Sequence, residues 1–76
     1  MSSVLILVTV EPNKDIEVRD QLRKISNITE CHLLYGPYDL YAKAVARTTE
    51  ELESLVFDDI RNVKGIRSTM TCFIAG

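Results

Sequence analysis

The sequence contains no tryptophan, one histidine, two cysteines and three glycines among its 76 residues. Two cysteines are too few for a disulfide-stapled fold, and no Cys-x-x-Cys motif is present to hold an iron–sulfur cluster. We interpret Cys31 and Cys72 as packing residues. Three scattered glycines do not form a phosphate-binding loop, and His32 lacks a second histidine with which to bind a metal. We therefore expect no metal and no cofactor.

The charges are balanced, with 9 basic and 11 acidic residues and a net charge of −2. The basic residues are scattered, whereas a nucleic-acid-binding surface usually needs a concentrated positive face, so we expect no direct DNA binding. No apolar run approaches the ~20 residues that cross a bilayer, and residues 1–10 lack the basic start of a secretory signal. These features predict one folded cytoplasmic domain without membrane contact.

The apolar pattern predicts the element order β-α-β-β-α-β. Asn13 is a plausible N-cap for the first helix, Thr48 with Glu51 fits a capping box for the second, and Gly65 is a natural stop. The expected strands cover residues 4–10, 27–35, 39–46 and 66–75, and the expected helices cover residues 14–26 and 49–64. The usual arrangement of that order is an α+β, ferredoxin-like fold: a four-stranded antiparallel sheet with both helices on one face.

The expected topology has two consequences for function. Right-handed crossovers place the third strand between the first two, so that the turns at Gly36-Pro37 and at Gly65 lie at one end of the sheet. The first strand is apolar on both faces, because Leu5 and Leu7 alternate with valine and isoleucine. Two helices cover only one face, so we expect a second copy on the other, giving a dimer through the sheet.

The hairpin segment "YGPYD" and the last strand hold the candidate binding residues. Asp39 is able to accept hydrogen bonds from an ammonium group, and backbone N–H groups near Gly36 are able to approach a carboxylate. Thr69 and Thr71 offer hydroxyls on one strand face. This set suits a zwitterion such as a free amino acid. The same residues are also ordinary turn and strand formers, so both interpretations remain open on the residues alone.

Two motifs, in this order, resemble the effector (RAM) domain of Lrp/AsnC-type transcription regulators. The family pattern is a strand ending in G-x-Y/F-D, followed later by a G-V/I-x-x-T-x-T strand. The matching residues are Gly36, Tyr38 and Asp39, then Gly65, Ile66, Thr69 and Thr71. The resemblance covers essentially the whole chain as one domain, residues 1–76. It implies dimers through the sheets, octamer-like rings of dimers, and amino acids bound between dimers by the Gly36–Tyr38–Asp39 loop with the last strand nearby.

Two departures from the family pattern shape the predicted function. Full-length members carry a helix-turn-helix domain, whereas this sequence starts its first strand at about Val4 and is similar to the stand-alone version. Pro37 stiffens the loop. We expect a non-enzymatic, homo-oligomeric, amino-acid-binding module that senses alone or joins full-length regulators, and that loses its effector in Asp39→Ala.

Two alternatives stay open. One is a small dimeric α+β barrel enzyme with His32 or Asp39 as its acid–base group, in a cleft between helices and sheet. The other is a ligand-free assembly module that acts through its sheet face and edges.

Overall fold

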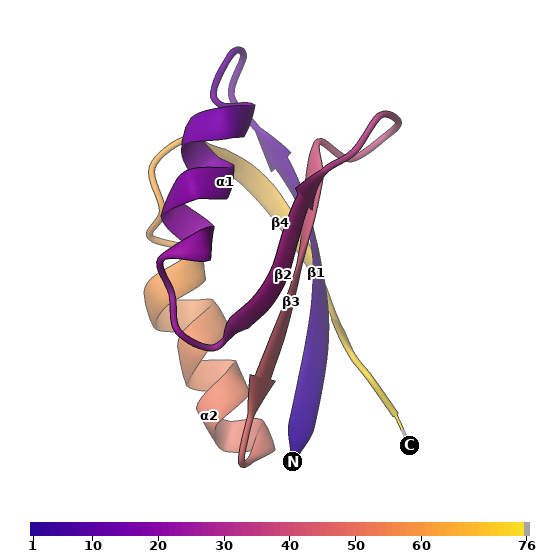
Figure 1. Cartoon of the computed structure of the whole chain (residues 1–76), viewed down its shortest axis with the longest axis vertical. Coiled ribbons are helices and arrows are strands. Elements are labelled where there is room, and N and C mark those ends of the chain that lie inside the picture. The colour runs from indigo at the N-terminus through magenta and orange to yellow at the C-terminus, as the bar shows by residue number, and fades with distance from the viewer. Residues whose placement is uncertain (76) are drawn as a thin grey trace.

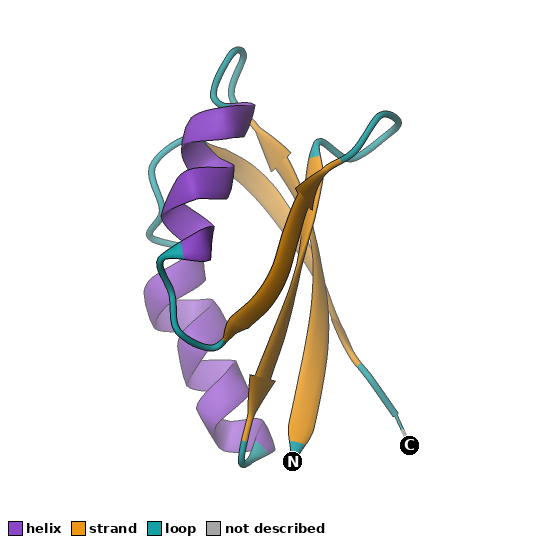
Figure 2. Ribbon diagram, viewed as in Figure 1, coloured by secondary structure: helices purple, strands orange, loops and turns teal. Residues whose placement is uncertain are grey.

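A four-stranded antiparallel sheet carries the helices on one face in the computed structural model, which describes residues 1–75 (Figures 1 and 2). The elements are β1 (Ser2–Val10), α1 (Asp15–Arg23), β2 (Ile28–Leu33), β3 (Leu40–Ala46), α2 (Thr49–Ser54), the π-helix η1 (Leu55–Ile60) and β4 (Ile66–Phe73). The strand order is β2-β3-β1-β4, with every neighbouring pair antiparallel. The predicted ferredoxin-like fold class is confirmed, including the place of β3 between β1 and β2.

The core lies between the sheet and the helices, and it follows from strict alternation on the two central strands. The helix-facing residues of β1 and β3 are all buried: Val4, Ile6, Val8, Val10, Leu40, Ala42, Ala44 and Ala46. The buried residues that the helices contribute to this core are Val18, Leu22, Leu52, Leu55, Val56 and Ile60. The three alanines leave room for the helices to approach the middle of the sheet.

No helix or strand of residues 1–75 covers the opposite face of the sheet (Figure 1), and this face carries apolar side chains. Leu7 lies at its centre, paired with Tyr41 on β3 and with Met70 on β4. Leu5 is the next residue on this face of β1, and the side chain of Met70 is 49% exposed. We call this the open sheet face. Its apolar character agrees with the two-faced pattern of the first strand.

The helix starts differ in how well the sequence predicted them. Thr48 caps α2 by accepting a hydrogen bond from the Glu51 amide (3.2 Å), while the Glu51 carboxylate accepts from the Arg47 amide. The predicted Asn13 cap is wrong: Lys14 is the N-cap residue, and Asn13 takes the left-handed conformation (φ 66°), which asparagine tolerates. The helix ends at Arg23 rather than near residue 26, and Ile16 in its first turn is 54% exposed.

The second helix becomes a π-helix over Leu55–Ile60, which the sequence did not predict. The Arg61 amide donates to the Val56 carbonyl at 3.1 Å. This acceptor lies five residues earlier in the chain, whereas an α-helix uses the residue four earlier. Short π segments occur often at functional sites. The helix ends at Ile60, with Arg61 as its C-cap residue, so the predicted stop at Gly65 is wrong. Gly65 instead takes a positive φ of 99° in the turn that leads into β4.

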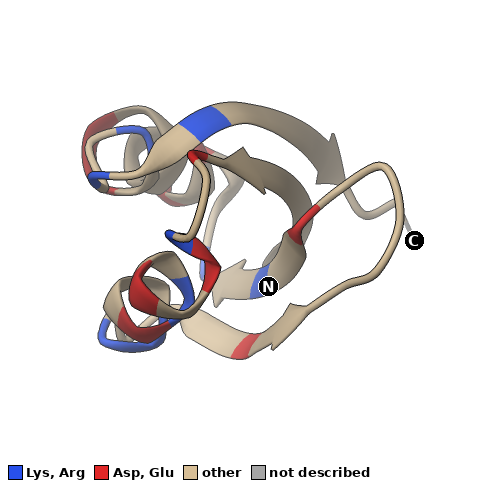
Figure 3. Cartoon of the chain, turned by 90° about the horizontal axis from the view of Figure 1, so that it is seen from above, with Lys and Arg blue, Asp and Glu red and all other residues tan. Residues whose placement is uncertain are grey.

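The two helices differ in charge. α1 carries both acidic and basic residues (Figure 3), whereas every charged residue of α2 and η1 is acidic. Within residues 1–75, none of the helices has the length and apolar character needed to cross a membrane.

Candidate functional site

The five predicted site residues lie in two places within one chain. Gly36, Tyr38 and Asp39 belong to the loop between β2 and β3. The Tyr38 hydroxyl donates to the Met70 sulfur at 3.5 Å, and Met70 belongs to the open sheet face. Thr69 pairs with Val8 and therefore lies on the helix side of β4, as does Thr71, the partner of Ile6. A single chain thus brings the loop and the two threonines to opposite faces of β4.

Asp39 fastens the loop to the end of β1. Its carboxylate oxygen Oδ2 accepts a hydrogen bond from the Val10 amide at 2.8 Å in a part-buried position. Its own amide donates to the Val8 carbonyl at 2.9 Å, and its carbonyl accepts from the Leu34 amide at 2.9 Å. The second carboxylate oxygen is the one left for an ammonium group. Asp39 therefore has a structural role that the sequence did not indicate.

This contact predicts different outcomes for two substitutions of Asp39. Asp39→Ala leaves the Val10 amide without its partner and should lower the free energy of unfolding by about 1–3 kcal/mol. Asp39→Asn keeps a side-chain oxygen for that amide and should stay close to the parent. Urea unfolding of both variants measures the difference. Equal stability of the two variants would show that the Asp39–Val10 bond contributes nothing.

The tip of the loop is open. Gly36 has a φ of +148°, and a Cβ placed there meets no atom within 4 Å. Tyr35 is fully exposed beside it. A closed pocket at this tip therefore requires groups from outside the chain.

A cavity of about 460 Å³ lies between the second helix and the edge strand β4. We call it the helix–strand cavity, and its lining residues are Glu53, Val56, Phe57, Arg61, Thr69, Thr71 and Phe73. The volume falls within the range of roughly 300–1,000 Å³ that is usual for small-molecule sites. Two of the five predicted site residues, Thr69 and Thr71, line it.

The charges of the helix–strand cavity come from the helix. The Arg61 guanidinium lies 4.9 Å from the centre of the Phe57 ring, and this cation–π contact restrains it. The π-helical bond at Val56 sets where Phe57 and Arg61 stand on the helix. Glu53 supplies the opposite charge, about two turns before Arg61.

The helix–strand cavity therefore combines a cation, an anion and hydroxyls with an apolar wall. A guanidinium recognises a carboxylate, a carboxylate recognises an ammonium group, and threonine hydroxyls serve either. Sequence reasoning missed Glu53, Phe57 and Arg61, because the acidic runs of this helix look like an ordinary solvated face. The signal that was present is Phe57 followed four residues later by Arg61, a spacing at which the two side chains meet on a helix.

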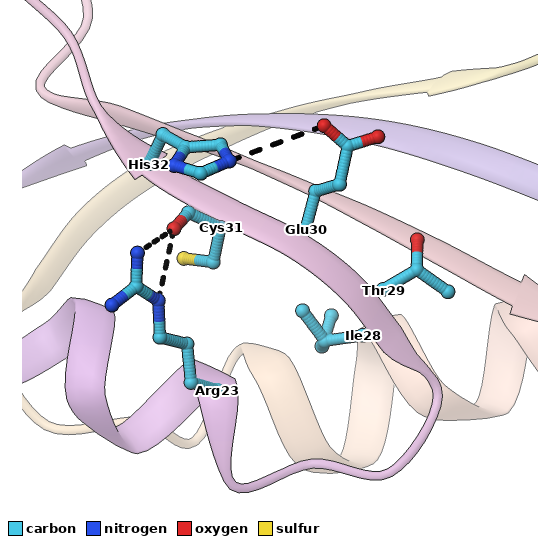
Figure 4. Close-up of a pocket in the computed structure, with 6 residues that line it drawn as sticks. All are labelled: Arg23, Ile28, Thr29, Glu30, Cys31 and His32. Carbon is cyan, nitrogen blue, oxygen red and sulfur yellow. Dashed lines mark hydrogen bonds and ion pairs between the residues drawn. The ribbon is translucent and has the colours of Figure 1, made fainter.

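A second hollow, about 280 Å³, lies along the edge strand β2 (Figure 4). Arg23 donates two hydrogen bonds to the Cys31 carbonyl, at 3.0 and 2.6 Å. Burial raises the pKa of the Cys31 thiol, so the thiol stays protonated near neutral pH. Figure 4 shows Glu30 and His32 on the other side of the strand from Cys31. The polar side chains that line this hollow therefore point to two sides of β2 and do not converge on one point. No group of three or more His, Cys, Asp or Glu residues within residues 1–75 is placed to hold a metal ion.

The whole length of this fold matches a known family. A family model described as the Lrp/AsnC ligand binding domain matches residues 3–75. The chain belongs to the Lrp/AsnC ligand-binding domain family. Its resemblance in sequence to Lrp/AsnC effector domains is thereby confirmed.

Proteins with a similar sequence or structure include both longer chains and chains of similar length. The uncharacterized HTH-type transcriptional regulator PH1916 of Pyrococcus horikoshii is 32% identical over 73 residues, which cover 92% of this chain and 49% of the regulator. This chain thus spans about half the length of such curated relatives. The crystal structure of FFRP-DM1 superposes with a TM-score of 0.94 at 28% identity, covering 99% of this chain and 100% of that one.

One further structure shares the fold. Transcriptional regulator NMB0573 of Neisseria meningitidis, solved as a complex with L-Met, has a TM-score of 0.84 at 19% identity. The match covers 99% of this chain and 50% of that one.

Proposed function

We propose that this Lrp/AsnC domain is a non-enzymatic regulatory module that binds a free amino acid in the helix–strand cavity. The observation that carries the proposal is that Arg61 and Glu53 line the same cavity as Thr69 and Thr71, whose hydroxyls add further polar groups. A zwitterion places its carboxylate at Arg61 and its ammonium group at Glu53, and its side chain packs on the apolar wall. The L-Met complex of NMB0573, which has the same fold, supports this ligand class.

The loop residues Gly36, Tyr38 and Asp39 enter the site from a neighbouring subunit in this proposal. They lie across β4 from the threonines of their own chain, and the loop tip is open. A contact between dimers that docks this loop over a neighbour's helix–strand cavity joins the five predicted residues into one site. The free carboxylate oxygen of Asp39 then adds a second acceptor for the ammonium group.

The open sheet face supports the first level of assembly, a dimer of two copies of this chain. Leu5, Leu7 and Met70 leave apolar area exposed on a sheet that already has both helices on its other side. Dimers then associate into an octamer-like ring through the ligand sites. An amino acid bound between dimers favours the assembly state to which it binds more tightly, which is how the signal is transmitted.

The module acts in the cytoplasm as a sensor by itself or in mixed assemblies with full-length regulators of its family. The full-length match to FFRP-DM1 supports the first mode, and the half-length matches to helix-turn-helix regulators support the second. Of the two alternatives, the barrel enzyme has no support from the helix–strand cavity, because neither of its proposed acid–base residues, His32 and Asp39, lines that cavity. The ligand-free assembly module remains as the outcome of a negative binding test.

A thermal-shift screen against the twenty amino acids, with subunit number followed by light scattering, tests the proposal. A ligand at a hundredfold excess over its Kd stabilises by about 2.7 kcal/mol, which shifts the midpoint of a small domain by on the order of 10 °C. The shift should disappear in Arg61→Gln and in Thr71→Val. It should persist in Lys24→Gln, which removes one exposed charge on α1 away from the cavity. If no amino acid shifts the midpoint or changes the subunit number, the proposed function is wrong and the chain is a ligand-free assembly module.

A further inference from the structure

A third hollow, about 360 Å³, lies further along the edge of β4 from the helix–strand cavity. Its lining residues are Arg61, Ile66, Arg67, Ser68 and Thr69. We call it the two-arginine cavity. It shares Arg61 and Thr69 with the helix–strand cavity, so one guanidinium borders both spaces. The two cavities are therefore neighbouring parts of one groove.

The two-arginine cavity has donors and no acidic lining residue. Each guanidinium carries five N–H donors, and Ser68 and Thr69 add a hydroxyl each. The ion pairs within residues 1–75 join other residues, so no carboxylate of that part of the chain lies within 4.0 Å of Arg61 or Arg67. Two guanidinium groups border the same space, and no acidic residue lies between them. An oxyanion in that space would stabilise both, because each guanidinium offers a planar pair of N–H donors to the oxygens of the anion.

A β-bulge sets the geometry of this cavity. Val10 pairs with Ile66 while Thr9 pairs with Ser68, which leaves Arg67 as the extra residue. A one-residue slip exchanges the two faces of a strand, so without the extra residue Ile66 would lie on the open sheet face. With the bulge, Ile66 packs against the core on the same side of β4 as Thr69 and Thr71. Bulges frequently re-aim side chains beside active sites, and this one lies where Arg67 borders the cavity.

We propose that the two-arginine cavity is an oxyanion subsite that holds an acidic group next to the amino-acid site. The charge along the groove runs from Glu53 through Arg61 to Arg67, so a dicarboxylic amino acid fits with its ammonium group at the first and its side-chain carboxylate at the last. In that form the inference rests on the proposed function. The same donors also hold a free oxyanion such as inorganic phosphate, which does not depend on that function.

The experiment compares glutamate with glutamine, aspartate with asparagine, and inorganic phosphate with chloride at equal ionic strength. Binding to the purified full chain is followed by thermal shift and calorimetry. We expect each acidic amino acid to bind about tenfold more tightly than its neutral amide, from one additional charge-assisted contact. Arg67→Gln should remove this preference without changing the affinity for the amide, and Arg67→Lys should restore part of it. Lys64→Gln, an exposed charge change just before Gly65 that does not line the cavity, should leave the preference intact.

The outcomes separate this inference from the proposed function. If phosphate alone stabilises the parent and Arg67→Gln abolishes that effect, the subsite stands as a site for a free oxyanion. If neutral amino acids bind through Arg61 and Thr71 while acids and phosphate give no additional effect, the proposed function stands and the subsite is wrong. Equal losses in Arg67→Gln and Lys64→Gln would also overturn it, because they would report only the net charge of the surface.

Discussion

Leu7→Lys is expected to convert the proposed dimer into folded monomers. Leu7 is at the centre of the open sheet face, between Tyr41 and Met70. In a dimer through this face, two lysine ammonium groups would be removed from water without a partner, at a cost of several kcal/mol each. In the monomer the same side chain remains in water. Light scattering should then give the mass of one chain.

Ile16→Lys is the matched control for this prediction. Ile16 is also an exposed aliphatic residue, but it lies on α1, on the other side of the molecule from the open sheet face. Its substitution should leave the mass of the assembly unchanged. Circular dichroism should show a folded chain for both variants, since Leu7 lies outside the buried core. A Leu7→Lys protein with the parent's mass would contradict assembly through the sheet.

The fold was predictable because its determinants are local and periodic. Alternation on β1 and β3, the Thr48 cap and the turn at Gly65 are each visible within a few residues of sequence. The π-helix and the bulge at Arg67 were not, because both insert one residue into a regular pattern in response to packing. The consequence is visible at Ile66. Strict alternation along β4 would place Ile66 on the face of Ser68, whereas the bulge turns it toward the core.

The candidate site was predictable only in part, for a related reason. The motifs identify Asp39 and the two threonines, but they do not show that a hydrogen bond across 29 residues of sequence already occupies one Asp39 oxygen. Alternation alone also does not reveal that the threonines and Tyr38 lie on opposite faces of β4. Arg61 was overlooked because a charged residue on a helix is usually solvated, and only its contact with Phe57 distinguishes it.

Gly65→Ala is expected to cause the largest loss of stability among single substitutions outside the core. The φ of +99° disfavours any residue with a Cβ, at a cost of about 1–2 kcal/mol. The added Cβ would also lie 2.9 Å from Val18 Cγ2 and 3.2 Å from Lys14 Cβ. Val18 is fully buried and has little room to move, so overpacking adds about 1–3 kcal/mol.

Gly36→Ala provides the comparison that isolates this packing effect. Gly36 also has a positive φ, but its added Cβ meets nothing within 4 Å, so the substitution costs backbone strain alone. Urea unfolding of the two variants should therefore place Gly65→Ala well below Gly36→Ala. Domains have only about 5–15 kcal/mol of stability, so the loss at Gly65 is a large fraction of the total. Because the Gly65 carbonyl also accepts the Glu11 amide at 2.7 Å, displacement of this turn would loosen the start of β4 and with it the two-arginine cavity. Equal stability of the two variants would mean that α1 moves aside freely, and that the turn does not hold β4 in place.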